Sequence, residues 1–375
     1  MKIIHILKGC PSPSSMVGVN IGTHYLVLEQ MRAGYDVEVW ALGSSSKHTP
    51  QEYEYKLLLF PARKSMFWIS EELKDAIDYL KTNTWVQMHS VFIPEFMIIA
   101  RRLRRRKIKY GISPHGGYGS LLRNYIKKRI YIALVESRLL TNASIIHALA
   151  ETEATQIRKL ITPKAKIIEA PNGYILKPLE GFKPASVNTQ RPVFCFCGRL
   201  DKLHKGLDLL INGFAMYKSQ GGKGVLWIIG DGADRAFLES KAQTLGVSEH
   251  VVFYGALFKE EKLRILVNMD LFMHTSRWEG MPTSCIEAAS LRKPLLVSKE
   301  TNMGEYIVKW NSGIVLLDND SEIIASALRD CENMYADGSL MKMGHNAGKM
   351  VENEFRWDKI AVKLAEAWKS ELSAK

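Results

Sequence analysis

The sequence predicts an α/β protein built from two doubly wound domains. Three observations support this fold class. The chain has 375 residues, more than a single compact core usually takes. Short apolar runs alternate with amphipathic stretches of helical period, which favours parallel strands joined by crossover helices. The alternation stops in a segment that contains three prolines and then starts again, so we expect a second domain after that segment.

The first half of the chain alternates between predicted strands and predicted helices. Ser70 can cap the second of these helices, because its hydroxyl can accept a hydrogen bond from the first turn and acidic residues follow it. The predicted strands are KIIHIL (2–7), DVEVWAL (36–42), WVQMH (85–89), KYGIS (109–113), SIIHAL (144–149) and KIIEAPNG (166–173). The predicted helices are THYLVLEQMRAG (23–34), SEELKDAIDYLKTN (70–83), the stretch around IIARRLRRR (98–106) and ETEATQIRKL (151–160).

The segment KPLEGFKPASVNTQRP (177–192) is the predicted linker, because it has little periodicity. The predicted strands after it are PVFCFCG (192–198), VLWIIG (225–230), VVFYG (251–255), LFMHTS (271–276) and PLLVS (294–298). The predicted helices are LDLLINGFAMYKS (207–219), DRAFLESKAQTLG (234–246), KLRILVNM (262–269), CIEAASLRK (285–293), SEIIASALRDCENMY (321–335) and WDKIAVKLAEAWKSEL (357–372). Open α/β sheets bind ligands at the carboxyl ends of their strands, so we expect a cleft between two such domains.

Composition excludes several classes of protein. Apolar residues make up 46 % of the chain, which is enough to bury a core and argues against disorder. The apolar runs are too short to cross a bilayer, and IIHIL near the start lacks the features of a signal peptide. Five scattered cysteines argue against a disulfide framework, and Cys195 and Cys197 lack the partners of a zinc site. We therefore expect a cytoplasmic protein.

The net positive charge of the chain lies in its first half. Residues 1–187 hold 27 Lys and Arg against 15 Asp and Glu, whereas residues 188–375 hold 24 of each. The bases are densest in RRLRRRKIK (101–109) and in RNYIKKRIYIALVESRLL (123–140). A solvated helix face, a nucleic-acid site and an anionic membrane surface all fit such charge. In the second stretch, bases interleaved with Tyr and Ile favour an interfacial helix. The sequence contains no nucleic-acid-binding motif.

Two basic residues follow the first predicted strand of the second half. In GRLDKLHKGLDLL, Arg199 comes at the end of the strand and Lys205 comes at the start of the next helix. A helix N-terminus presents free N–H groups and a partial positive charge. Two surface bases near a loop are the alternative interpretation. Their pairing at a strand-to-helix turn favours a site for a multiply charged anion such as a diphosphate.

The stretch RWEGMPTSCIEAAS (277–290) predicts a turn that contains Glu279, followed by a helix with Glu287 in its second turn. Pro282 fits the first helical position, and the N–H groups near Met281 and Thr283 would face a ligand. An acid repels phosphate but accepts hydrogen bonds from vicinal hydroxyls. Diphosphate and sugar hydroxyls together describe a nucleotide sugar. Taken alone, Glu279 could instead be an acid that favours the helix dipole.

As an ordered set, these motifs resemble those of retaining glycosyltransferases of family 4, whose two-domain fold is called GT-B. Glu279 and Glu287, with seven residues between them, match the family's E-x7-E motif. The further matches are SPHGG (113–117), PNG (171–173), GRL…KG (198–206), IIGDG (228–232), VVFYG (251–255) and FRWDKIAVKLAEAW (355–368). The last of these is similar to the helix that crosses back onto the first domain. The resemblance therefore implies an acceptor-side domain at 1–187, joined by the helix at 356–375, and a nucleotide-sugar-binding domain at 188–355.

The resemblance also implies roles for individual residues in the second domain. Arg199 and Lys205 would hold the donor diphosphate, Glu287 would bind the ribose hydroxyls, and Glu279 would contact the donor sugar. The reaction would be a front-face attack in which a donor phosphate oxygen takes the proton of the acceptor. We expect no metal requirement, because the cations that stabilise the leaving diphosphate belong to the chain.

In the first domain, the resemblance assigns His115 to the donor sugar and Gly18 to the glycine-containing loop beside the phosphates. The family often has two glycines there, and this chain has Val17 and Gly18. His5, His89 and His274 end or line apolar strands, where we expect structural histidines with satisfied hydrogen bonds.

Two motifs are discounted. DND (318–320) imitates a metal-binding motif of another glycosyltransferase fold, but it lies between a strand and a helix and fits a loop with a helix cap. GDGAD (230–234) lacks the full spacing of a dinucleotide-binding loop.

The sequence as a whole predicts a retaining glycosyltransferase that moves a sugar from a UDP- or GDP-sugar to a saccharide acceptor. We expect the acceptor to be lipid-linked, the pathway to be bacterial surface polysaccharide synthesis, and the enzyme to be peripheral on the inner membrane face. A small soluble acceptor, a nucleotide-sugar epimerase on a similar fold and a basic nucleic-acid-binding module are the alternatives. The last leaves the E-x7-E and GR…KG motifs unexplained, so we expect no nucleic-acid partner.

Overall fold

The chain forms two compact units. The computed structural model describes residues 1–12, 15, 17–43, 53–61, 67–122, 125–175 and 189–374. The first unit comprises Met1–Ile175 and Arg356–Lys375, and the second comprises Leu176–Phe355. Most of the predicted linker at 177–192 lies outside the described residues.

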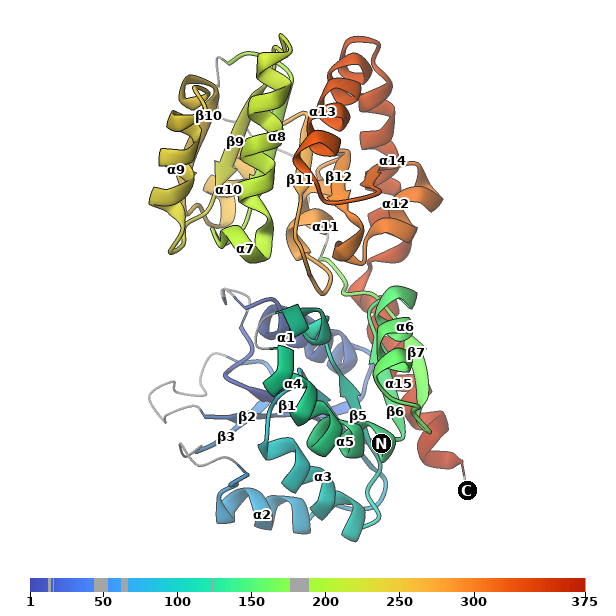
Figure 1. The fold of residues 1–375 in the computed structure, drawn as a ribbon. Helices are drawn as coiled ribbons and strands as arrows, with labels where there is room; N and C mark the ends of the chain where they lie inside the picture. Colours follow the sequence, from blue (N-terminus) through green and yellow to red (C-terminus); the bar gives the residue numbers. More distant parts are fainter. Residues whose placement is uncertain are drawn as a thin grey trace. The chain divides into compact units, whose positions relative to one another are not determined.

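The first unit contains a sheet of seven strands that all run parallel (Figure 1). Its strand order is β3-β2-β1-β4-β5-β6-β7. The strands are β1 (Lys2–Lys8), β2 (Asp36–Leu42), β3 (Lys56–Phe60), β4 (Thr84–His89), β5 (Tyr110–Ser113), β6 (Ile145–Ala148) and β7 (Lys166–Glu169). The order reverses between β1 and β4, so the loops that follow these two strands diverge from each other at a topological switch point.

Helices cover both faces of this sheet. Apolar side chains of α2, α3, α5 and α6 pack on one face, and those of α1 and α15 pack on the other. The helices are α1 (Gly18–Arg32), α2 (Glu71–Asp78), α3 (Glu95–Arg105), α4 (Tyr125–Tyr131), α5 (Ser137–Thr141), α6 (Glu151–Leu160) and α15 (Trp357–Ser373). A 3₁₀ helix, η2 (Gly117–Leu122), precedes α4, and a π-helical turn, η3 (Ile132–Glu136), joins α4 to α5. Ser70 caps α2 as predicted, since its hydroxyl accepts from Leu73 N at 3.2 Å.

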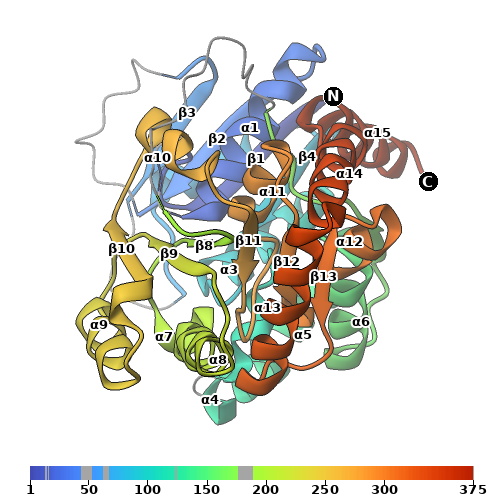
Figure 2. The same ribbon diagram turned by 90° about the horizontal axis from the view of Figure 1, so that it is seen from above.

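The second unit contains a parallel sheet of six strands in the order β10-β9-β8-β11-β12-β13. The strands are β8 (Val193–Cys197), β9 (Val225–Ile229), β10 (Val251–Gly255), β11 (Leu271–His274), β12 (Leu295–Ser298) and β13 (Gly313–Leu316). The helices are α7 (Lys202–Lys205), α8 (Leu207–Ser219), α9 (Arg235–Thr244), α10 (Lys259–Leu266), α11 (Thr283–Ser290), α12 (Gly304–Trp310), α13 (Ser321–Ala336) and α14 (Ser339–Glu354), with 3₁₀ turns η4 (Ser248–His250) and η5 (Lys299–Thr301). Figure 2 shows α8, α9 and α13 on one face of this sheet and α11, α12 and α14 on the other.

The predicted fold class is confirmed, because both units are parallel sheets covered by helices on two faces. The sequence prediction missed β3, β13, α12 and α14. β3 and β13 are short edge strands, for which a brief apolar run gives little periodic signal. α14 contains two glycines, which weaken a helix pattern. Among the helices of the described ranges, none has the length and apolar content that crossing a bilayer takes.

The last helix, α15, belongs to the first unit although the second unit precedes it in the chain (Figure 1). Trp368 is fully buried and stacks on Trp85 of β4 with ring centroids 5.7 Å apart. Trp357 packs against Gly173 of the PNG motif, where a Cβ would lie 2.4 Å from the indole ring. Gly173 therefore provides the space into which the start of α15 docks, and the buried face of α15 completes the core of the first unit.

We predict that Trp368→Ala destabilises the first unit by about 3–5 kcal/mol, because it removes a large buried aromatic side chain. Urea unfolding followed by probes in each unit measures this, and the second unit should keep its transition. Glu366→Ala, an exposed position on the same helix, should change stability by less than about 0.5 kcal/mol. A Trp368 variant as stable as the Glu366 control would show that α15 contributes little to the first unit.

Candidate functional site in the second unit and its counterpart in the first

The strand order of the second sheet reverses between β8 and β11, so its switch point lies there. The loop after β8 carries Arg199 and leads into α7, and the loop after β11 carries Glu279 and leads into α11. Figure 1 shows α7 and α11 at the same end of this sheet. The fold thus brings together two predicted site segments that are about 80 residues apart in the sequence.

The two loops touch at Gly206, between α7 and α8. Gly206 has a φ of 64°, in the left-handed region, and a Cβ there would lie 2.0 Å from the backbone oxygen of Thr275. The Thr275 hydroxyl donates to the backbone oxygens of Lys205 and Gly206 at 3.3 and 3.4 Å. Only glycine fits this position, because both the backbone conformation and the contact exclude a side chain.

Arg277 ties the loop after β11 to α7 and α8. Its guanidinium forms a two-pronged ion pair with Asp208 at 2.8 and 2.7 Å and donates to the backbone oxygens of Lys202 and Leu203 at 3.1 Å. Its backbone N–H donates to His204 O at 2.9 Å. The carbonyl groups of α7 are therefore satisfied by the neighbouring loop, which holds the short helix in place.

Glu279 is the centre of a charged cluster. Its Oε2 atom pairs with the Lys205 ammonium, accepts from His274 Nε2 and Ser276 Oγ at 3.3 Å, and lies 3.7 Å from His204 Nε2. The side chains of Glu279 and Lys205 are 15 % and 13 % exposed, so the pair is largely shielded from water. Within the described residues, all of these contacts engage Oε2, which leaves Oε1 as the oxygen for a ligand.

The Glu279 carboxyl is ionised at neutral pH. Burial alone would raise its pKa, but Lys205, His274 and His204 together hold the pKa well below its usual range. Burial lowers the pKa of His274 to about 4, so this ring is neutral and acts as a hydrogen-bond donor. The site therefore contains a fixed carboxylate that can accept hydrogen bonds from hydroxyl groups.

Lys205 occupies a different position from the predicted one. It ends the four-residue helix α7 and does not begin α8, which starts at Leu207. Its ammonium also pairs with Glu279, a contact that the sequence prediction did not include. By contrast, Arg199 has a side chain that is 60 % exposed, and its guanidinium lies 3.3 Å from His204 Nδ1 and 3.8 Å from Asp201.

Glu287 lies in the second turn of α11, as predicted, and pairs with Lys262 of α10 at 2.7 Å. Burial would lower the pKa of Lys262, but Glu287 outweighs it and raises the pKa. Cys197, the last residue of β8, is close enough to both charges for them to act on its thiol, whose pKa burial raises to about 12. Glu287 and Arg199 thus lie at the same end of β8.

The start of α11 differs slightly from the prediction. Pro282 is the N-cap residue and Thr283 is the first helical residue, one position later than predicted. The Met281 side chain is buried, while Thr283 is partly exposed. The Asn302 side chain donates to the backbone oxygens of Glu279 and Gly280 at 3.2 and 2.6 Å, which fixes the turn before α11.

The predicted site residues of the first unit are Gly18 and His115. Gly18 begins α1, and among the described residues no atom lies within 4 Å of where a Cβ would be. His115 follows β5 with a φ of 54°, and its ring hydrogen-bonds to His89 at 2.9 Å. A left-handed backbone is uncommon for a residue other than glycine and often marks a functional site.

The two discounted motifs have structural roles. Asp320 of DND caps α13, since its side chain accepts from Glu322 N at 2.7 Å. Asp234 of GDGAD accepts from Lys202 N at 2.8 Å and supports α7. In the part of the chain that the structure describes, no three His, Cys, Asp or Glu side chains converge as a metal site would need.

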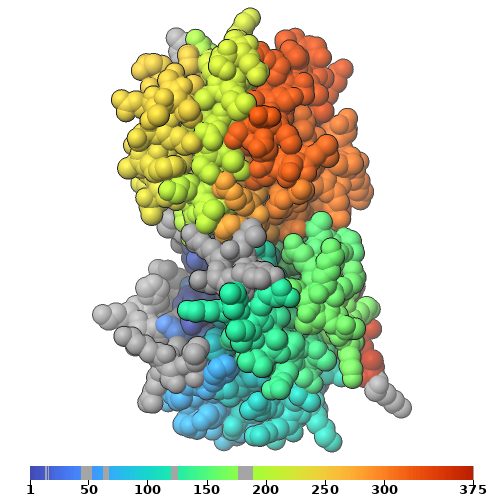
Figure 3. Space-filling view, viewed as in Figure 1, coloured from blue at the N-terminus to red at the C-terminus, as the bar shows by residue number. Residues whose placement is uncertain are grey.

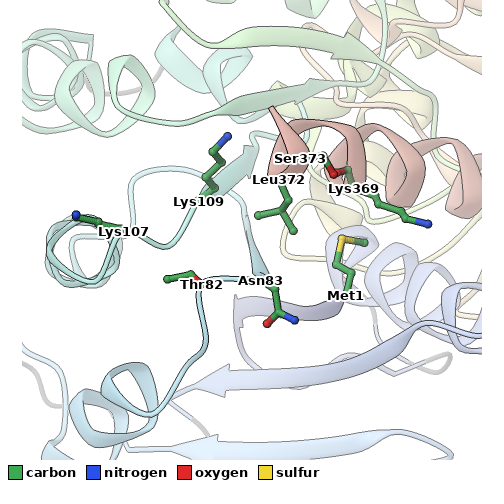
Figure 4. Close-up of a pocket in the computed structure, with 8 residues that line it drawn as sticks. All are labelled: Met1, Thr82, Asn83, Lys107, Lys109, Lys369, Leu372 and Ser373. Carbon is green, nitrogen blue, oxygen red and sulfur yellow. The ribbon is translucent and has the colours of Figure 1, made fainter. Parts of the chain in front are cut away.

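A pocket of about 500 Å³ lies at the amino edge of the first sheet, where β1, β4 and β5 begin (Figure 4). This edge is opposite to the carboxyl edge that carries His115. Its lining residues are Met1, Thr82, Asn83, Lys107, Lys109, Lys369, Leu372 and Ser373. Figure 4 shows the amino groups of Lys107 and Lys369 pointing away from each other. Lys109 donates to the backbone oxygens of Glu371 and Ala374 at 2.6 and 2.9 Å. The pocket therefore lacks the converging cations of an anion site and lies away from the strand ends that carry the candidate residues.

Two features of the site were not predicted from the sequence. Lys262 lies in an ordinary charged helix segment, KEEKLRIL, which gives no signal that it would pair with Glu287. The Lys205–Glu279 pair joins the last residue of α7 to the loop after β11, and only the strand order brings them together.

Family comparisons agree with the fold. Residues 17–173 match the glycosyl transferase 4-like domain, and residues 180–350 match the glycosyl transferases group 1 family. The chain thus carries a glycosyl transferase 4-like domain followed by a group 1 glycosyl transferase domain, and its architecture is that of the GT-B glycosyltransferases.

Individual proteins give similar results. A capsular polysaccharide biosynthesis glycosyltransferase, CapM of Staphylococcus aureus, is 29 % identical over 175 residues, which are 44 % of this chain and 42 % of CapM. The matched region thus covers less than half of the length of CapM. Among solved structures, a sucrose-phosphate synthase from Thermosynechococcus elongatus matches with a TM-score of 0.77 at 17 % identity and covers 100 % of both chains. HepE of Anabaena, in complex with UDP and glucose, matches with a TM-score of 0.73 at 16 % identity over 99 % of this chain and 100 % of HepE.

We predict that Lys205→Met destabilises the second unit by about 3–5 kcal/mol, because it leaves the buried Glu279 carboxylate without its cation. Adding Glu279→Gln should recover most of that loss, since the amide carries no charge. Urea unfolding of the single and double variants measures the coupling.

The matched control for this pair is the exposed ion pair between Arg264 and Glu260 on α10. Arg264→Met should cost less than about 1 kcal/mol, as is usual for exposed pairs. If Lys205→Met costs no more than this control, Glu279 does not depend on Lys205 for its charge.

Proposed function

We propose that this protein is a retaining glycosyltransferase that transfers a sugar from a nucleotide-diphosphate sugar to a saccharide acceptor. The observation that carries the proposal is the Glu279 cluster: an ionised carboxylate is anchored through Oε2, keeps Oε1 for a ligand, and pairs with Lys205, while Arg199 approaches the cluster through His204. A carboxylate that faces sugar hydroxyls beside cations that face phosphates suits a ligand that contains both groups.

The cations act on the leaving diphosphate. Negative charge grows on the diphosphate as its bond to the sugar breaks, and a nearby fixed cation stabilises that charge. Arg199 is exposed enough to reach a phosphate, and the Lys205 ammonium has three N–H groups, of which Glu279 takes one. Because these cations belong to the chain, the proposal needs no metal ion, and transfer should survive a chelator.

Glu287 is the proposed ligand of the ribose hydroxyls. Its ion pair with Lys262 orients the carboxylate at the end of β8. In the first unit, Gly18 offers an uncrowded backbone for the phosphates, since no atom of the described ranges lies within 4 Å of the position of a Cβ. His115 is proposed to contact the donor sugar. Front-face attack, in which a donor phosphate oxygen receives the proton of the acceptor, retains the configuration of the sugar without a carboxylate nucleophile.

The acceptor is proposed to be a lipid-linked saccharide in bacterial surface polysaccharide synthesis. The relation to CapM, a capsular polysaccharide biosynthesis glycosyltransferase, supports the pathway. HepE, of the same fold, binds UDP and glucose, which supports a UDP-sugar donor, and a GDP-sugar remains the alternative to be tested. We propose a cytoplasmic enzyme that works on the inner membrane face.

The proposed membrane contact is the α4–η3 segment, on the face of the first unit that Figure 3 shows. Ile126, Ile130 and Leu134 are 72 %, 54 % and 60 % exposed and follow one another at helical spacing. Lys127 and Arg129 are exposed beside them, so the segment combines apolar and basic groups as an interfacial helix does. The Lys128 ammonium lies 5.2 Å from the centroid of the Phe92 ring, so this side chain also packs against the rest of the first unit.

The basic residues of 101–109 lie elsewhere on the first unit. Arg104 and Arg105 end α3, and Arg106 follows them at the amino edge of the sheet, before β5. The α4 segment follows β5 and lies at the carboxyl edge, as His115 does. The sequence prediction included both basic stretches and favoured the second for an interfacial helix. We propose α4, in this second stretch, as the membrane contact, because it lies at the same edge of the sheet as His115.

Screening UDP- and GDP-sugars for thermal stabilisation, followed by product analysis with and without a saccharide acceptor, tests the proposed function. Glycosyltransfer requires an acceptor and releases the nucleoside diphosphate. A sugar converted to its epimer without acceptor would favour the epimerase, and transfer to a soluble sugar phosphate alone would exclude the lipid-linked acceptor.

We predict different effects for the two acids. Glu287→Gln should weaken binding of the free nucleoside diphosphate by about tenfold or more, because hydrogen bonds to charged groups contribute about 1.5–3 kcal/mol. Glu279→Gln should spare that affinity and reduce transfer, because its partner is the sugar. Calorimetric titration and initial rates measure the two effects, with the exposed Glu260→Gln as control. Equal losses of nucleotide affinity in both variants would contradict these separate roles.

We predict that the protein binds anionic liposomes at low salt and is released as salt rises, since each base near such a surface adds about 1 kcal/mol and salt screens the attraction. Ile126→Ser with Ile130→Ser should reduce co-sedimentation at least about tenfold, because each loses apolar burial in the lipid. Arg104→Glu with Arg105→Glu, at the other edge of the sheet, should have the smaller effect. Wild-type protein that stays in the supernatant would leave the soluble-acceptor alternative ahead.

A further inference from the structure

Three histidines form a continuous hydrogen-bonded chain beneath the carboxyl edge of the first sheet. His5 Nδ1 lies 2.8 Å from His89 Nε2, and His89 Nδ1 lies 2.9 Å from His115 Nε2. At the inner end, His5 Nε2 lies 2.8 Å from Oε1 of Gln30 on α1. His5, His89 and Gln30 are fully buried, whereas His115 is partly exposed at the strand end.

The hydrogen bond between Gln30 and His5 determines which ring nitrogen of each of the three histidines carries a proton. An amide oxygen only accepts, so His5 Nε2 carries a proton, and a neutral ring then has a bare Nδ1. That Nδ1 accepts from His89 Nε2, and the bare Nδ1 of His89 accepts in turn from His115 Nε2. The outermost atom, His115 Nδ1, is therefore unprotonated and can only accept a hydrogen bond.

We infer that Gln30, His5 and His89 are positioning residues that set the tautomer and ring orientation of His115, so that His115 presents a hydrogen-bond acceptor to a hydroxyl of the donor sugar. This inference rests on the proposed function, in which His115 contacts that sugar. It excludes a phosphate oxygen as the partner of His115 Nδ1, because two acceptors cannot share a hydrogen bond without a proton.

The rings of the chain are neutral at neutral pH, as the proton pattern requires. Burial lowers the pKa of His5 to about 4 and that of His115 to about 3, and burial followed by the neighbouring histidines lowers the pKa of His89 well below its ordinary value. A protonated ring would turn an acceptor into a donor and break the chain at that point.

The backbone of His115 is fixed as firmly as its ring. His115 and Gly116 have φ values of 54° and 73°, and Gly116 N donates to the buried Glu153 carboxyl at 2.5 Å. Glu153 also accepts from Leu149 N at 2.7 Å, which anchors it near the start of α6. With both ends of the residue held, a catalytic or binding group is preorganised and needs little rearrangement when the ligand arrives.

His147, in the neighbouring strand β6, provides an internal reference. Its Nε2 donates to the backbone oxygen of Ala170 at 2.8 Å, and its Nδ1 accepts from Ser113 at 2.9 Å. Ser113 in turn accepts from Gln87, whose side-chain oxygen accepts from Trp85. A carbonyl at one end and an indole N–H at the other allow only one proton pattern, which does not involve Gln30.

Gln30 lowers the stability of the folded protein, which suggests that it is retained for its role in the hydrogen-bonded chain of histidines. Its Nε2 atom is buried and has no hydrogen-bond partner among the described residues. An unsatisfied buried donor costs about 1–3 kcal/mol, so an apolar side chain of similar length should be tolerated for folding. Without an acceptor at position 30, however, the two hydrogen bonds between the histidines can reverse, which would place a proton on His115 Nδ1.

The experiment is long-range ¹H–¹⁵N NMR of histidine-labelled protein, which shows which ring nitrogen carries the proton. The wild type should show His115 protonated on Nε2, assigned by loss of its signals in His115→Asn. Gln30→Met should shift His115 toward the Nδ1-protonated form and leave His147 unchanged. Gln30→Glu keeps an acceptor at this position and should preserve the wild-type pattern. An Nδ1 proton on His115 in the wild type, or a His115 pattern indifferent to Gln30→Met, would overturn the inference.

Kinetics supply the second readout. Gln30→Met should keep its melting temperature and its affinity for the free nucleoside diphosphate, and lose about tenfold to a hundredfold in kcat/KM for transfer, as a misplaced contact to the reacting sugar does. Gln30→Glu should restore most of the activity. A tautomer change without a change in kcat/KM would refute the positioning role. If no nucleotide sugar binds at all, the proposed function fails, while the NMR result still decides whether the chain exists.

Discussion

The close approach of two loops at Gly206 is the constraint on which the candidate site of the second unit depends. With the Thr275 carbonyl 2.0 Å from where a Cβ would lie, the turn between α7 and α8 can rest directly on the loop after β11. That contact puts Lys205 against Glu279 and lets Arg277 satisfy the carbonyls of α7. Because residue 206 is a glycine, charged residues from two segments that are distant in the sequence can form a single cluster.

In the first unit, the turns after the strands are held in place by buried carboxyl groups and not by a glycine contact. Its strand ends use non-glycine residues in the left-handed region, namely Ser90, Phe92 and His115. Buried carboxyls hold these turns: Glu136 accepts from Phe92 N at 2.6 Å and from Tyr118 at 3.2 Å, and Glu153 accepts from Gly116 N. Burial raises the pKa of Glu136 to about 7 and that of Glu153 to about 6, so these carboxyls are costly to keep charged. Such strain persists only where the surrounding structure overdetermines it.

The sequence was sufficient for the architecture and for the identity of the segments at the strand ends. Alternating periodicity predicts both parallel sheets, and the spacing of Glu279 and Glu287 predicts a loop acid followed by a helix acid, as found. The two ion pairs could not be predicted from the sequence, because Lys262 and Lys205 meet their partners only through the strand order of the folded sheet. The histidines in β1 and β4 were expected to be satisfied structural residues, and they are hydrogen-bonded. That they are bonded to one another and to His115 depends on register, which local pattern does not encode.

The position of α15 has a consequence for how the protein is made. The second unit is a continuous stretch of chain, whereas the first needs residues from both ends. During synthesis the first unit emerges early, but the part of its sheet that α15 covers stays exposed until Trp357 and Trp368 have left the ribosome. The second unit can complete its core before then, so folding finishes in the opposite order to translation. A nascent chain interrupted after α14 but before the end of α15 would carry a finished second unit attached to a first unit with exposed apolar surface, which chaperones and proteases recognise.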